Sequence, residues 1–229
     1  MKYAIDFVPV PTLPVAGSTE PFPVGRIYCV GRNYAEHARE MGHDPEREPP
    51  FFFMKPANAI VPDGATIPFP RATRELHHEI ELVVALGKGG ANIAVADALD
   101  HVWGYGVGLD MTRRDLQGEA KKMGRPWEMG KSFDDSAPCT ALIPASKIGH
   151  PAKGAIWLKV NGAIKQSGDL SAMIWNVPET IAYLSGLITL QPGDLIYSGT
   201  PAGVGPVKPG DKLEGHVDGV GDLTVTYAR

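Results

Sequence analysis

The sequence predicts an α+β fold that is mainly β, and three observations support this class. Glycine and proline, with 27 and 21 of the 229 residues, are too abundant for a helical protein and are typical of short strands joined by tight turns. Apolar residues gather in short runs with the two-residue period of a strand, as in residues 76–84. Turn motifs divide the last third of the chain into strand-length pieces: Pro192-Gly193-Asp194, Pro209-Gly210-Asp211 and Asp218-Gly219.

We expect residues 1–25, which carry five prolines, to run extended along the body of the protein. Residues 27–30 then form a first core strand, which Gly31 ends. Asn33 can accept a bond from a free amide of the next turn and so cap a helix over residues 34–41. His37 and Glu40 are three residues apart on that helix and therefore share a face.

Further along, residues 42–50 are polar and contain three prolines, the profile of a mobile surface loop, and the apolar strand 51–54 follows them. Residues 76–84 alternate as a half-buried strand does. Residues 102–109 indicate another strand, whose glycines allow a second backbone or a ligand to approach closely. Beyond it a helix carries five basic residues, most of which we expect to face solvent although one could reach a bound substrate: Arg113, Arg114, Lys121, Lys122 and Arg125.

The second half of the chain contains a strong hairpin signal, Asn161-Gly162 between residues 156–160 and 163–166. Pro178 is expected to start a helix that runs to about Leu187, with Glu179 near its positive end. We find no repeat, low-complexity tract or linker. The sequence therefore predicts one domain over residues 26–229, preceded by the extended segment.

Composition and charge exclude several classes of function. With 22 basic and 26 acidic residues, a net charge of -4 and no basic block, the chain is not expected to bind nucleic acid or an anionic membrane surface. Cys29 and Cys139 lack a metal-like spacing and are expected to be reduced, buried thiols. No signal-peptide pattern and no apolar stretch of roughly 18 residues occur, so we expect a soluble, cytoplasmic protein. The four tryptophans are expected in the core or at a subunit interface.

Glu79 and Glu81 are two residues apart on a predicted strand and therefore point to one face, about 7 Å apart. Two anions in a partly buried space repel each other unless a positive charge lies between them. A third acid, Asp110, follows the strand 102–109. If the three converge, they suit a hard cation such as magnesium or manganese. Acid pairs of this spacing also occur on solvated strand faces, so the pattern alone leaves both interpretations open.

Six motifs, in order between residues 26 and 215, resemble those of the fumarylacetoacetate hydrolase family. They are Gly31-Arg32-Asn33-Tyr34-Ala35-Glu36-His37, Lys55-Pro56, His77-His78-Glu79-Ile80-Glu81-Leu82, Gly108-Leu109-Asp110-Met111-Thr112, Gly130-Lys131-Ser132-Phe133-Asp134 and Ser198-Gly199-Thr200-Pro201-Ala202-Gly203-Val204-Gly205. Within that family the chain most resembles the fumarylpyruvate hydrolases of gentisate degradation, in residues 22–30 and in the strand 51–56.

The resemblance implies a mixed β-sandwich roll with short flanking helices, assembled as a homodimer. It implies that Glu79, Glu81 and Asp110 hold Mg²⁺, with Mn²⁺ as an alternative. The implied reaction is hydrolytic cleavage of a carbon–carbon bond in a 2,4-diketo acid. For a fumarylpyruvate hydrolase the products are fumarate and pyruvate.

The resemblance also implies roles for individual side chains. His37 and Glu40 match the family's water-activating pair, a histidine base with a carboxylate that orients it. Lys131 matches the active-site lysine that stabilises the oxyanion at the attacked carbonyl. Three further residues match positions that hold the 2-oxoacid end of the substrate: Arg32, Gln117 and Thr200. The imidazoles of His77 and His78 are expected to be structural rather than metal ligands.

Other activities share these motifs. Acylpyruvate hydrolysis, oxaloacetate decarboxylation and isomerisation of 2-hydroxyhepta-2,4-diene-1,7-dioate remain alternatives, and a non-catalytic cation-binding protein is a remote one. The pair His37 and Glu40 favours hydrolysis, because decarboxylation needs no activated water. We further expect residues 34–50 to form a lid over bound substrate. Four cations are candidates for a distal carboxylate of the substrate: Arg39, His43, Arg47 and Lys121.

Overall fold

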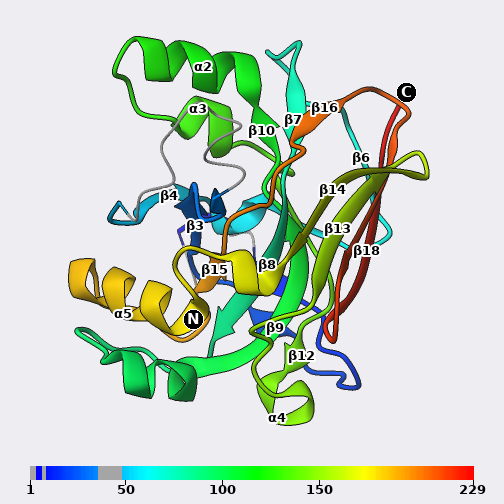
Figure 1. Cartoon of the computed structure of the whole chain (residues 1–229). Coiled ribbons are helices and arrows are strands. Elements are labelled where there is room, and N and C mark those ends of the chain that lie inside the picture. Colours follow the sequence, from blue (N-terminus) through cyan, green and yellow to red (C-terminus); the bar gives the residue numbers. More distant parts are fainter. Residues whose placement is uncertain (1–3, 7–8, 36–47) are drawn as a thin grey trace.

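The computed structural model describes residues 4–6, 9–35 and 48–229, and its centre is a large mixed sheet (Figure 1). In spatial order this eight-stranded sheet contains β4 (Phe51–Lys55), β3 (Ile27–Gly31), β15 (Leu195–Tyr197), β8 (Ile80–Leu86), β9 (Val102–Leu109), β11 (Ala137–Cys139) and β5 (Ile60–Pro62), with β12 (Ile143–Pro144) paired to β9.

A five-stranded sheet packs against one face of the central sheet. Its order is β14 (Ala163–Asp169), β13 (Ala155–Val160), β17 (Lys212–Val217), β18 (Gly221–Tyr227) and β6 (Thr66–Ile67). A smaller sheet joins β10 (Thr112–Arg113), β7 (Leu76–His78) and β16 (Gly205–Val207), and β1 (Thr12–Leu13) pairs with β2 (Phe22–Pro23). The fold is therefore α+β and mainly β, as the sequence predicts.

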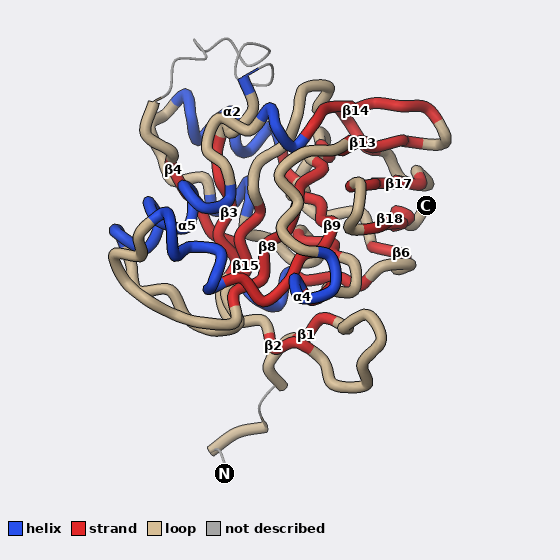
Figure 2. The backbone as a smooth tube through the Cα atoms, turned by 60° about the horizontal axis from the view of Figure 1, so that its bottom comes forward, coloured by secondary structure: helices blue, strands red, loops and turns tan. Residues whose placement is uncertain are grey.

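The helices are short and lie around the sheets (Figures 1 and 2). The α-helices are α2 (Arg114–Lys122), α3 (Glu128–Lys131), α4 (Ala145–Ile148) and α5 (Val177–Leu187), and the 3₁₀ helices are η1 (Ala57–Ala59), η2 (Val95–His101) and η3 (Leu170–Ala172). Helix α5 begins one residue before the predicted Pro178. A capping box fixes its start, because Asn176 accepts from the Glu179 amide while Glu179 accepts from the Asn176 amide.

Strand β8 is buried on both faces, which corrects the prediction of a half-buried strand. Leu82 and Val84 belong to the core that the five-stranded sheet closes. Val83 and Ala85 point the other way, into a second core cluster that also contains Leu13 and other residues of the N-terminal segment. A strand covered on both faces reads as a continuous apolar run, so the alternation in the sequence understated its burial.

Two predictions made at glycines, a hairpin turn and a close backbone approach, are confirmed. Asn161 and Gly162 both have positive φ, 51° and 80°, and join β13 to β14 as a tight hairpin. Gly104 of β9 lies so close to β12 that an added Cβ would come within 2.3 Å of the Ile143 carbonyl oxygen. Cys29 and Cys139 are free, buried thiols, as predicted, and burial raises the pKa of Cys139 to about 12.

Candidate active site

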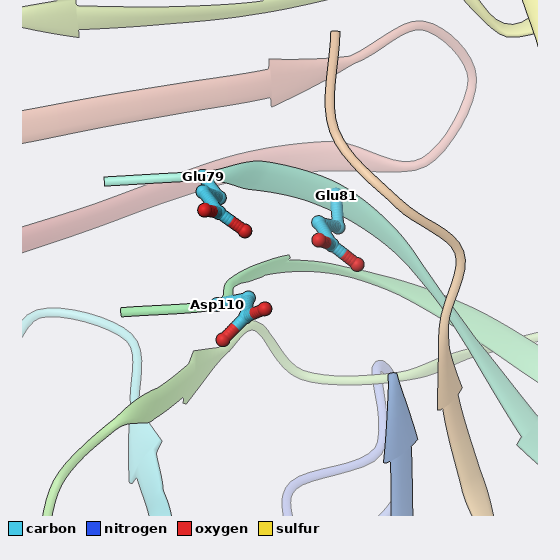
Figure 3. A group of neighbouring side chains, drawn as sticks. All are labelled: Glu79, Glu81 and Asp110. Carbon is cyan, nitrogen blue, oxygen red and sulfur yellow. The ribbon is translucent and has the colours of Figure 1, made fainter. Parts of the chain in front are cut away.

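Three carboxylates meet where two central strands end. Glu79 lies between β7 and β8, Glu81 is the second residue of β8, and Asp110 directly follows β9. The register places Glu81 opposite Gly108, and the Asp110 amide donates to the Glu79 carbonyl at 2.9 Å. The side chains point toward one another (Figure 3), are all buried, and offer oxygens within 4.8 Å of one another. The predicted convergence of the three acids is therefore found in the structure.

The backbone around Glu79 differs from the prediction. Residues 76–84 do not form one strand, because the chain leaves the three-stranded sheet at His78 and enters the central sheet at Ile80. Glu79 occupies the break. A break between two sheets lets its carboxylate turn toward Asp110, whereas a residue inside a continuous ladder has its direction set by the pleat.

Three basic side chains neutralise part of this charge. Lys131 Nζ lies 2.8 Å from Glu79 Oε2 and 2.6 Å from Asp110 Oδ2, and it donates to Thr112 Oγ1 at 2.6 Å. Lys55 Nζ lies 2.9 Å from Asp110 Oδ1. Arg114 pairs with the other oxygen of Glu79. Burial lowers the pKa of Lys131, but attraction to Asp110 and Glu79 together raises it by more, so the net pKa of this lysine is raised.

Glu81 receives less compensation than its two neighbours. Among the described residues it accepts one hydrogen bond, from the Gly199 amide at 2.8 Å, and forms no ion pair. Burial, and then repulsion from Asp110 and Glu79, raises the pKa of Glu81 well above its usual value. Three buried carboxylate ligands with an excess of negative charge at Glu81 suit a hard divalent cation. The residues present therefore fit a magnesium or manganese ion held by Glu79, Glu81 and Asp110.

A pocket opens beside the acids, and the five described residues that were predicted to contact substrate all line it. These are Arg32, Gln117, Lys121, Lys131 and Thr200. Arg32 directly follows Gly31, the predicted end of the strand and the last residue of β3, and adopts a positive φ of 54°. Gln117 is buried on α2 and accepts a hydrogen bond from Arg114 at 2.7 Å.

The predicted water-activating pair lies outside the described residues. His37 and Glu40 fall there, together with residues 36–41 of the helix expected over 34–41 and most of the expected lid, as do Arg39, His43 and Arg47. Asn33, the predicted cap of that helix, is described. Its side-chain amide donates to the carbonyls of Trp175 and Ser198 and accepts from the Trp175 amide, each at 2.8 Å, which fixes the loop after β3 against two distant segments.

Sequence reasoning missed two cations of this site. Arg114 belongs to the basic run expected mostly to face solvent, of which one member could reach the substrate, but it was not singled out; it contacts Glu79 and lines the pocket. Lys55 carried no expected role, although it ends an apolar strand at a position where a lysine is buried only if paired. Its ammonium also donates to the Met111 carbonyl at 3.0 Å and to the Lys131 carbonyl. The lysine of the Lys55-Pro56 motif was the available signal.

Aromatic side chains form the remaining wall, which corrects another expectation. Trp127 was expected in the core or at an interface, but it lines the pocket together with Phe51 and Phe53. Two cations of the pocket lie over these rings. Arg32 is 4.9 Å from the centre of Phe51, and Lys121 is 5.3 Å from that of Trp127. Burial, and then repulsion from Arg114 and Arg32, lowers the pKa of Lys121. Four cations and two acids line the pocket, and this excess of positive charge favours an anion.

The two histidines before Glu79 are placed differently from each other. His78 is buried, and its Nδ1 lies 2.9 Å from Gln166 Oε1. His77 is partly exposed and lies beside Arg114 and Glu75. Neither belongs to the group of acids that could hold a metal. None of the helices within the described ranges is both long and apolar enough to cross a membrane.

Comparison with known proteins gives a consistent assignment. The fumarylacetoacetate (FAA) hydrolase C-terminal family profile matches residues 26–227. A fumarylpyruvate hydrolase of Pseudomonas aeruginosa, solved with Mn²⁺ and pyruvate, is 54% identical with a TM-score of 0.96, over 99% of each chain. A mitochondrial oxaloacetate tautomerase of Mus musculus is 50% identical over 89% of this chain and 91% of its own length. A 2-hydroxyhepta-2,4-diene-1,7-dioate isomerase of Mycobacterium marinum is 34% identical with a TM-score of 0.80, over 91% of this chain and 76% of that one.

Proposed function

The chain belongs to the fumarylacetoacetate hydrolase family, and from this premise we propose that it hydrolyses a carbon–carbon bond of a 2,4-diketo acid. The substrate we favour is fumarylpyruvate, which would give fumarate and pyruvate in gentisate degradation. The observation that carries the proposal is one pocket lined by two of the three buried acids, which together fit a divalent cation, and by cations that can bind an organic anion. The Pseudomonas aeruginosa fumarylpyruvate hydrolase, 54% identical, was solved with Mn²⁺ and pyruvate, the two species this pocket would hold.

In this proposal different residues of the pocket contact different parts of the substrate. Arg32, Gln117 and Thr200 hold the 2-oxoacid end, and Arg114, which also lines the pocket, adds a planar guanidinium suited to a carboxylate. The aromatic wall of Phe51, Phe53 and Trp127 limits the entry of water.

The bond cleavage that we propose begins with His37, oriented by Glu40. His37 removes a proton from water as that water adds to the C4 carbonyl. The bond between C3 and C4 then breaks, C4 leaves as a carboxylic acid, and the electron pair passes into the enolate of pyruvate. Protonation at C3 completes pyruvate. A bound magnesium or manganese ion would supply Lewis acidity that stabilises negative charge at the 2-oxo group.

Lys131 is proposed to stabilise the oxyanion at C4. In the structure its ammonium protons go to Glu79, Asp110 and Thr112, so this role requires the lysine to exchange one of these partners for substrate. A divalent cation at the acids would make that exchange easier, because it would take over part of the charge that Lys131 now neutralises.

The positive charge of the pocket lining supports a substrate with a second carboxylate. Of the four candidates for the distal carboxylate, Lys121 is the one within the described residues, and it lines the pocket beside Arg32. Fumarylpyruvate carries such a carboxylate on its distal arm, whereas acetopyruvate has a methyl group there. We therefore propose Lys121 as a contact that favours fumarylpyruvate.

A second candidate function is oxaloacetate chemistry. The Mus musculus relative, 50% identical, is named an oxaloacetate tautomerase, and oxaloacetate also combines a 2-oxoacid with a second carboxylate. Tautomerisation or decarboxylation would use the same acids and the same 2-oxoacid contacts, and the proposed base would move a proton at carbon instead of activating water. Isomerisation of 2-hydroxyhepta-2,4-diene-1,7-dioate, the activity named for the Mycobacterium marinum protein, stands further away at 34% identity.

One assay distinguishes these activities. The protein is stripped with a chelator, and loss of fumarylpyruvate absorbance is followed with and without added Mg²⁺ or Mn²⁺, beside acetopyruvate and oxaloacetate under the same conditions. Metal-dependent cleavage of fumarylpyruvate well above the other two supports the proposal. A preference for oxaloacetate supports the second candidate. Turnover of none of them contradicts both and favours a non-catalytic cation site.

The assembly and location remain proposals. We propose a homodimer, whose test is the mass in solution by light scattering. We also propose a cytoplasmic location, whereas the Mus musculus relative is named as mitochondrial. Fractionation of the source cells would test the location.

A further inference from the structure

We infer that Gln166 is a positioning residue that turns the Thr200 hydroxyl into a hydrogen-bond donor facing the pocket. The inference rests on the proposed function, because it concerns how Thr200 would hold the 2-oxoacid. Gln166 lies outside the pocket lining and on a different sheet from the acids. It is fully buried all the same, and its amide group contacts both the strand break at Glu79 and the loop that carries Thr200.

A β-bulge aims this side chain inward. Leu158 pairs with Gln166 and Lys159 with Ile164, so Lys165 has no partner of its own on β13. Gln166 is the one buried residue of β14, while Ile164 is 53% exposed. Bulges redirect side chains near functional sites. Here the bulge turns a polar side chain of the outer hairpin toward the centre of the molecule.

The Thr200 loop lies directly on the bulge. Gly203, at φ +93°, passes so close that an added Cβ would come within 2.1 Å of the Lys165 carbonyl oxygen. A Cβ at Gly168 would meet Pro201 at 2.8 Å. Two glycines therefore permit the close approach of this loop to β14, which brings the loop within reach of the Gln166 amide.

The hydrogen bonds of Gln166 fix the orientation of its amide. Oε1 accepts from the Ile80 amide at 3.0 Å, and Nε2 donates to the Pro201 carbonyl at 2.9 Å. If the amide were flipped, its NH₂ group would face the Ile80 N–H and its oxygen would face the Pro201 carbonyl oxygen, so only one orientation forms both hydrogen bonds. His78 Nδ1, 2.9 Å from Oε1, must then carry a proton.

The same orientation decides the role of Thr200. Nε2 of Gln166 lies 2.8 Å from Thr200 Oγ1, and because an amide nitrogen only donates, the hydroxyl must accept this bond. Its own proton is then directed elsewhere, and within the described residues no side chain or carbonyl accepts it. Thr200 lines the pocket, so the proton is available to a carboxylate or oxo group of a bound 2-oxoacid. Gln166 acts through Thr200 and touches no substrate itself.

A double-mutant cycle on ligand binding tests the inference without relying on turnover. Gln166→Glu keeps the size of the side chain and an acceptor for Ile80, but it replaces the amide donors. Thr200→Val removes the hydroxyl and keeps the shape. Oxalate, a small 2-oxoacid mimic, is titrated calorimetrically into protein saturated with Mn²⁺. We expect each single variant to weaken oxalate binding by about ten- to a hundredfold, the range for a hydrogen bond to a charged group.

The double variant should then bind oxalate no more than about threefold more weakly than Thr200→Val alone, because Gln166 acts only through the Thr200 hydroxyl. Thr200→Ser, which retains the hydroxyl, should bind oxalate nearly as wild type does. Ser167→Ala, on the exposed side of the same strand, is the matched control and should change nothing. Melting curves establish that each variant is folded. If Gln166→Glu does not fold, Gln166→Met takes its place in the cycle, because it also removes the amide donors.

The outcomes separate the inference from the function on which it rests. Additive losses in the double variant would show that Gln166 acts by general structural support and would overturn its positioning role. Thr200→Val that binds oxalate as tightly as wild type would overturn that role even without a folded Gln166 variant. Wild-type protein that binds no oxalate with Mn²⁺ would overturn the proposed function itself, and the role of Gln166 with it.

Discussion

Replacement of Lys55 by methionine tests whether a buried ammonium holds the acidic centre together. Its side chain is fully buried, and its ammonium contacts Asp110 Oδ1 at 2.9 Å, the Met111 carbonyl at 3.0 Å and the Lys131 carbonyl. Methionine follows the path of the lysine stem closely, so the change removes the charge and the donors with little change in packing. It leaves a buried carboxylate and two buried carbonyl oxygens short of a partner.

The size of the effect follows from those contacts. Removing one partner of a buried ion pair costs about 3–5 kcal/mol, because the remaining charge stays desolvated. For a chain of this length, each kcal/mol lowers the melting temperature by about 2–4 °C. We therefore expect Lys55→Met to melt roughly 10 °C below wild type in the presence of chelator. A divalent cation should raise the melting temperature of the variant more than that of wild type, because the variant has lost a cation next to Asp110.

Thermal unfolding and unfolding in urea, both followed by far-ultraviolet circular dichroism with and without Mn²⁺, measure the melting temperatures and the free energies of unfolding. The matched control is Lys208→Met, which removes an exposed lysine and should change the free energy of unfolding by less than about 0.5 kcal/mol. If Lys55→Met loses no more stability than this control in chelator, the buried ammonium does not support the acids. The reasoning would then be wrong.

Three further predictions concern other groups. Arg114→Leu should weaken binding of pyruvate in the presence of Mn²⁺ by about tenfold or more, measured by calorimetry, and Arg114→Lys should recover part of it; unchanged affinity would contradict a role for this guanidinium in the pocket. Cys29 and Cys139 should not react with a thiol reagent in the native protein and should react completely in guanidinium, because burial raises both pKa values. At His216, burial lowers the pKa, but the hydrogen bonds to Asp218 and Asp222 raise it by a larger amount, so the net pKa lies above the usual value. Its protonated form therefore stabilises the fold below about pH 6.5, and this contribution is lost as the pH rises through the folded pKa. Urea midpoints of wild type and His216→Gln should accordingly converge from pH 5.5 to pH 8.5, and a constant difference would refute the assignment.

Local features of the fold were predictable because their causes are local. The Asn161-Gly162 hairpin needs two residues that tolerate positive φ, and the start of α5 needs a cap and a nearby proline. The burial of β8 on both faces was not predictable from alternation. It depends on the N-terminal segment and the five-stranded sheet, which reach that strand from opposite ends of the chain.

The amino-acid sequence identifies the groups that could do chemistry here: three acids with the spacing for a cation, a lysine and polar residues in ordered motifs, and the turns between them. The pairing of these groups depends on the folded chain. Lys131 lies 52 residues from Glu79, and Gln166 lies 34 residues from Thr200, yet each pair is within 2.8 Å. The charge on a carboxylate and the direction of a hydroxyl proton depend on distance through space and on exclusion of water. Neither quantity is encoded in any short stretch of residues, so the neutralisation of the acids by Lys55 and Arg114, and the contact between Gln166 and Thr200, became visible only in the folded chain.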